Sequence, residues 1–110
     1  ESEAMNVIGN VKGKQCIIVD DIVDTGGTLV KAAEALYSKG AEDVQAYITH
    51  GVLSKNGMQT IQNSRLSSLV ITDTINNYED KNVKIISVGK LFAEAIRRVH
   101  HDESISVLFR

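Results

Sequence analysis

Short apolar runs along the chain predict the strands of a parallel sheet. Four segments carry this pattern, residues 15–19, 43–49, 68–72 and 83–87. In the first of them Cys16-Ile17-Ile18-Val19 is apolar without alternation, which is typical of a strand covered on both faces.

Helical spacing of apolar residues separates these strands. The first helix is predicted from Leu29, Ala32, Ala33 and Leu36, with Lys39 and Gly40 at its end. A short helix is expected over residues 57–63, and the clearest stripe runs from Val88 to Val99, with Ser87 placed to cap it. The order of these elements predicts an α/β fold, a mostly parallel sheet flanked by helices on both faces.

Composition is that of a single globular domain, residues 1–110, with 43% hydrophobic and 24% charged residues. The net charge of -2 gives no nucleic-acid footprint. No apolar run approaches the roughly 20 residues that a membrane-spanning helix needs. A lone cysteine, Cys16, fits a small core residue and a reducing cytoplasm. The chain begins with Glu1 rather than Met, so we expect it to be a piece of a longer protein.

The most informative segment joins the first strand to the first helix. It reads Asp-Asp-Ile-Val-Asp-Thr-Gly-Gly-Thr, from Asp20 to Thr28. Ligands of α/β proteins bind beyond the carboxyl ends of the strands. Gly26 and Gly27 let the backbone approach a phosphate, Thr25 and Thr28 add hydroxyl donors, and the helix that follows supplies free amides.

Acidic residues in the same segment suit a sugar. Asp20 and Asp21 can accept hydrogen bonds from ribose hydroxyls, and Asp24 can fix the loop or help to orient the reacting carbon. Carboxylates also suit Mg²⁺. Each feature alone has an ordinary explanation, a helix cap for the acids and a tight junction for the glycines. Their conjunction favours a ribose-phosphate site.

The segment resembles the phosphoribosyl-pyrophosphate motif of type I phosphoribosyltransferase folds. The rest of the chain resembles the carboxyl-terminal half of the ribose-phosphate pyrophosphokinase family. The resemblance is carried by Gly9-Asn10-Val11-Lys12-Gly13-Lys14, Tyr47-Ile48-Thr49-His50-Gly51, Thr72-Asp73-Thr74-Ile75 and the stretch from Leu91 to Phe109.

The resemblance implies a cytoplasmic transferase of nucleotide biosynthesis. It would move the diphosphoryl group of ATP to the C1 hydroxyl of ribose 5-phosphate, with Mg²⁺ and as a homo-oligomer. Asp20 and Asp21 would hold the ribose hydroxyls, and through them the metal, while residues 24–28 hold the phosphate. The ATP-binding half and the catalytic loop would lie upstream of Glu1, leaving this chain inactive alone. Ser104 and Phe109 match positions near an allosteric site between subunits.

Two alternatives share the same turn. A nucleobase phosphoribosyltransferase would also need a base-recognition hood and a pyrophosphate loop, and neither is evident. A ribose-phosphate-binding or assembly module with no activity of its own is the second alternative. No nucleic-acid or membrane partner is expected. His50 sits at a predicted strand end, where it either caps a loop or lies near the substrate.

Overall fold

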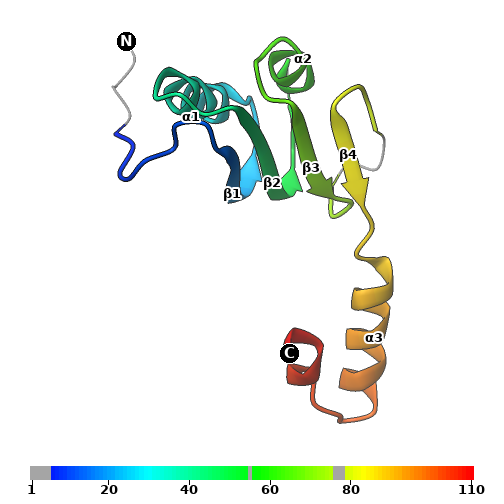
Figure 1. The fold of residues 1–110 in the computed structure, drawn as a ribbon. Helices are drawn as coiled ribbons and strands as arrows, with labels where there is room; N and C mark the ends of the chain where they lie inside the picture. Colours follow the sequence, from blue (N-terminus) through cyan, green and yellow to red (C-terminus); the bar gives the residue numbers. More distant parts are fainter. Residues whose placement is uncertain (1–5, 55, 76–78) are drawn as a thin grey trace.

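The strands of the sheet are parallel and lie in chain order. The computed structural model describes residues 6–54, 56–75 and 79–110. The sheet is β1-β2-β3-β4 (Figure 1), formed by β1 (Gln15–Val23), β2 (Asp43–Gly51), β3 (Ser68–Thr72) and β4 (Val83–Ile86). Each neighbouring pair of strands is parallel. The predicted α/β fold with a parallel sheet is therefore confirmed.

Two helices cover one face of this sheet. Helices α1 (Gly27–Ser38) and α2 (Gly57–Gln62) lie on the same side in Figure 1. Gly40 has φ 97°, the left-handed conformation expected where α1 ends. Inward-facing residues of alternating strand positions meet the helices, which is why the core forms here. The largest fully buried side chains are Ile61, Leu69, Ile71, Val44 and Val83.

The other face of the sheet is bare in the part of the chain that the structure describes. Its exposed side chains are those of Ile17, Val19, Tyr47 and Ile86. Among the described residues helices therefore cover one face and not both as expected, and the uninterrupted apolar run in β1 has one exposed face there. Cys16, on the helix side, packs against the core.

Helix α3 (Gly89–His100) leaves the sheet instead of packing on it (Figure 1). Only Ser87 and Val88 separate it from β4, and the Asp73 carboxylate accepts the Val88 N–H at 3.0 Å. This amide, and then the Ser87 hydroxyl, lower the pKa of Asp73. None of the residues of α3 is buried.

The carboxyl end of α3 is tied by ion pairs to the segment that precedes the short 3₁₀ helix η1 (Ser106–Phe109). Glu94 pairs with Arg98 at 2.8 Å, as predicted, and with Arg97 at 2.7 Å. Glu103 reaches the same Arg97 at 3.3 Å. The hydrogen bond from Arg97 contributes most to the lowered pKa of Glu94. No helix among the described residues is long and apolar enough to cross a membrane.

Strand β1 is longer than its apolar run predicts. The sequence pattern ends at Val19, whereas the strand continues to Val23. Pairing explains the difference, because Asp20 lies opposite Ile48 and Val23 opposite Gly51 in β2. Because aspartate is unfavourable in strands, residue propensities do not predict that β1 continues through Asp20 and Asp21. The two acids thus lie within the strand, and the turn begins only at Asp24.

Two valines on opposite faces of the sheet test the bare face. Val44 is 0% exposed and Val19 is 78% exposed. We expect Val44→Ala to lower the free energy of unfolding by about 2–3 kcal/mol, because it removes buried methyl groups and leaves a cavity. Val19→Ala should change it by less than about 0.5 kcal/mol. Urea unfolding measures both, and an equal loss for Val19→Ala would mean that this face is covered in solution.

Candidate functional site

The junction between β1 and α1 is three residues long and depends on Gly26. This glycine caps α1 with φ 89°, a left-handed conformation that other residues rarely adopt. It is buried, and an added Cβ would lie 3.2 Å from Cδ1 of Ile61 in α2. Its carbonyl accepts the Val30 N–H at 2.9 Å, which closes the first turn of the helix. The chain therefore turns sharply at a position where only glycine fits well.

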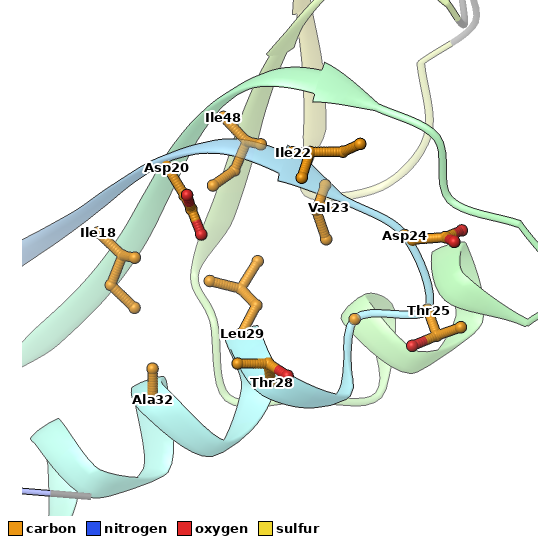
Figure 2. A pocket seen from close by; sticks show the side chains of 11 residues that line it. Ile18, Asp20, Ile22, Val23, Asp24, Thr25, Thr28, Leu29, Ala32 and Ile48 are labelled. Carbon is orange, nitrogen blue, oxygen red and sulfur yellow. The ribbon is translucent and has the colours of Figure 1, made fainter.

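A cavity of about 340 Å³ opens between β1 and the start of α1. Figure 2 shows the Asp20 carboxylate pointing from β1 toward α1, with Thr25 and Thr28 at the amino end of the helix. The cavity is lined by Ile18, Asp20, Ile22, Val23, Asp24, Thr25, Gly26, Thr28, Leu29, Ala32 and Ile48. Carboxylate and hydroxyl side chains thus line the same cavity as the amino terminus of α1.

Most of the predicted site residues meet in this cavity. It gathers Asp20, Asp24, Thr25, Gly26 and Thr28. The other two predicted residues, Asp21 and Gly27, are exposed and do not line it.

The separation of the two acids follows from their place in a strand. Successive residues of a strand point to opposite faces of the sheet, so Asp20 and Asp21 diverge. Their direct connection is local, since the Asp21 N–H donates to Oδ1 of Asp20 at 2.8 Å. A shared role of the acid pair stays a prediction.

Asp24 is held by the loop that follows β2. The Ser54 N–H donates to Oδ1 of Asp24 at 3.1 Å, and the Ser54 hydroxyl donates to the same oxygen in a short hydrogen bond. These contacts are those of a residue that fixes its loop, the first of the two roles considered for it. Ser54 was missed from the sequence, where the only signal was a polar segment after the next strand of a parallel sheet.

Other candidates lie along or beyond the same edge. The ring Nδ1 of His50 lies 2.7 Å from Oγ1 of Thr74, after β3. This hydrogen bond favours the loop-capping role of His50. Ser104 and Phe109 belong to the segment after α3 and do not line the cavity; the Ser104 hydroxyl lies 2.8 Å from that of Ser106.

A metal ion would depend on the substrate as well as on the protein. Among the described residues, no three histidine, cysteine or acidic side chains come together to hold an ion. Mg²⁺ is commonly held by one or two carboxylates together with substrate oxygens. The Asp20 carboxylate in the cavity fits that pattern.

Comparison with known proteins decides the family. Residues 1–110 match the family described as the phosphoribosyl synthetase-associated domain. The chain belongs to this family. A ribose-phosphate pyrophosphokinase of Campylobacter jejuni is 56% identical over 110 residues, which are 99% of this chain and 36% of the relative. One of Brucella melitensis is 53% identical over 113 residues, with the same two coverages.

A solved structure shows the same fold. The phosphoribosylpyrophosphate synthetase of Mycobacterium smegmatis superposes with a TM-score of 0.81 at 39% identity, over 86% of this chain and 33% of that one. The predicted family resemblance and the phosphoribosyltransferase-like fold are therefore confirmed. This phosphoribosyl synthetase-associated domain spans about a third of the length of these relatives.

Adjacent glycines in the turn provide a matched test of the junction. Gly26→Ala should lower the free energy of unfolding by about 1–3 kcal/mol, because alanine is strained at positive φ and meets Ile61. Gly27→Ala should be neutral or stabilising by up to about 1 kcal/mol, because its added Cβ meets nothing within 4 Å and the residue is helical. Thermal or urea unfolding compares the two. Equal effects would contradict the left-handed junction.

Proposed function

We propose that this domain supplies the ribose 5-phosphate site of a ribose-phosphate diphosphokinase. The observation that carries the proposal is the cavity, with the Asp20 carboxylate on its strand side and the amino end of α1 at its turn. An anion is favoured at a helix amino terminus by free amides and by the helix dipole. The names of the relatives support the same assignment.

In this proposal the turn holds the 5-phosphate. The backbone amides after Gly26 and the hydroxyls of Thr25 and Thr28 donate to phosphate oxygens. Gly27, the first residue of α1, contributes its amide. Asp20, which lines the cavity, accepts hydrogen bonds from the ribose hydroxyls, and a part for Asp21, on the other face of the strand, stays a prediction. The sugar is thereby oriented with its C1 hydroxyl toward the donor.

The reaction is a diphosphoryl transfer from ATP. The C1 hydroxyl oxygen forms a bond to the β-phosphorus of ATP, the bond from that phosphorus to the α-phosphate oxygen breaks, and AMP leaves while the hydroxyl proton is lost. Bound Mg²⁺ would neutralise charge on the transferred group. Asp20 is the residue here that would help to hold it through the substrate hydroxyls. Phosphoryl transfer depends mostly on positioning, so the domain contributes orientation of the acceptor.

We propose that the ATP site comes from the part of the relatives that this chain does not span. The proposed domain organisation is thus a phosphoribosyltransferase-like domain, residues 1–110, of a longer two-domain enzyme. A homo-oligomer and a cytoplasmic location stay predictions. Sedimentation of the purified chain and fractionation of cells check them.

Ribose 5-phosphate binding tests the site. We expect isothermal titration calorimetry to detect binding of ribose 5-phosphate and much weaker binding of ribose. Thr28→Val should weaken the affinity about tenfold, because one hydroxyl donor to a charged group is lost. Thr49→Val is the control, because Thr49 is exposed on β2 outside the cavity. Absence of ribose 5-phosphate binding, or equal loss in both variants, would contradict the assignment.

Incubation with ATP separates the proposed enzyme from its alternatives. With ATP, Mg²⁺ and ribose 5-phosphate, we expect this chain alone to release no AMP, measured by chromatography. AMP formation would contradict the proposal that the donor site lies elsewhere. Transfer of a nucleobase onto phosphoribosyl pyrophosphate would instead support the nucleobase phosphoribosyltransferase.

A further inference from the structure

The segment after β2 packs closely against the phosphate turn. Val23 is the last residue of β1, and its carbonyl accepts two amides of this segment, Val52 N–H at 2.9 Å and Leu53 N–H at 3.3 Å. Ser54 then donates both its N–H and its hydroxyl to Oδ1 of Asp24. Three consecutive residues of the β2–α2 connection, 52–54, therefore hold the start of the turn by hydrogen bonds.

The geometry of this segment leaves little freedom at the contact. Leu53 is buried and has φ 52°, a left-handed conformation that is unusual for leucine. The Gly57 N–H donates to the Ser54 carbonyl at 2.8 Å, and an added Cβ on Gly57 would clash with the Asp24 carbonyl oxygen. Non-glycine residues in such conformations persist where the surrounding structure holds them, often beside a functional site.

Asp24 itself points away from the substrate cavity. Although it lines the cavity, its carboxylate lies on the side of the β2–α2 segment in Figure 2, beyond the start of α1. Both hydrogen bonds from Ser54 converge on one of its oxygens. They hold the first residue of the turn, directly before Thr25 and Gly26.

We infer that Ser54 is a positioning residue, which sets the phosphate-binding turn through Asp24 without touching the ligand. The inference rests on the proposed ribose 5-phosphate site and deepens it, because it assigns part of the affinity of that site to the next loop of the sheet. Ser54 acts on the shape of the turn, so its loss lowers the affinity for the phosphate end of the ligand.

Calorimetry with matched serine variants measures the effect on the ligand. Ser54→Ala should weaken ribose 5-phosphate binding about tenfold, the effect of one hydrogen bond to a charged group. Ser54→Thr, which keeps a hydroxyl, should restore most of the affinity. Ser64→Ala is the control, because Ser64 donates to the Ile61 carbonyl at 2.6 Å and does not contact the turn. It should leave the affinity unchanged.

Coupling to Asp24 separates positioning from direct contact. If Ser54 acts through Asp24, then Asp24→Ala combined with Ser54→Ala should bind no more weakly than Asp24→Ala alone. Losses that add in the double variant would overturn the inference, because Ser54 would then have a route to the ligand that does not pass through Asp24.

Hydrogen exchange tests the same inference without any ligand. The Val30 N–H closes the first turn of α1 on Gly26 at 2.9 Å, and the Ser67 N–H bonds to the Val44 carbonyl at 2.9 Å, away from the turn. In Ser54→Ala we expect exchange at Val30 to accelerate several-fold relative to Ser67. Ser64→Ala should not produce this difference.

The outcomes distinguish the two proposals. If the original chain binds no ribose 5-phosphate but Val30 exchange accelerates in Ser54→Ala, the proposed function fails and the positioning of the turn stands. If Val30 exchange is unchanged relative to Ser64→Ala, the inference is overturned, whether or not the ligand binds.

Discussion

Parallel pairing of β1 with β2 is the constraint on which the site depends. Its register places Val23 opposite Gly51, so the two strands end together at one edge of the sheet. The connections that follow must therefore leave the sheet side by side. This arrangement brings Ser54 within hydrogen-bond distance of Asp24, and it places Ile61 of α2 against Gly26. A shift of one residue in this register would separate both pairs.

The edge also shows how local strain is balanced by packing. Leu53 adopts a left-handed conformation that costs about 1–2 kcal/mol in a residue with a side chain. Burial of that leucine side chain offsets a cost of this size, since it contributes about 1.5–3 kcal/mol. The two amides on the Val23 carbonyl then hold the strained segment in place. The strain is thus concentrated where the loop meets the turn.

Sequence patterns predicted the helices and strands well, but they did not predict which segments pack against each of them. Strand β3 matches its predicted range, and α2 differs from it by one residue, because periodicity and turn residues are local signals. The stripe of α3 correctly predicts a helix, yet nothing local says what covers it, and it stays exposed. The same limit applies to Ile17 and Val19, which are apolar on a bare face. Contacts between segments distant in sequence, such as Ser54 with Asp24, carry no pattern in either segment.

The motif itself was recognisable because its chemistry is compact, but its acids are not equivalent. Three carboxylates close to a phosphate would repel it, unless the chain separates or compensates them. Asp20 projects into the cavity from β1, away from the turn that would hold the phosphate. It is exposed, so solvent screens its charge. The strand alternation directs Asp21 to the other side. Asp24 is the first residue of the turn, and there the donors of Ser54 compensate its charge. An anion site beside three acids is therefore physically consistent, because the repulsion from each acid is reduced in a different way. Only Asp24 requires hydrogen-bond donors from a second loop, the one that carries Ser54.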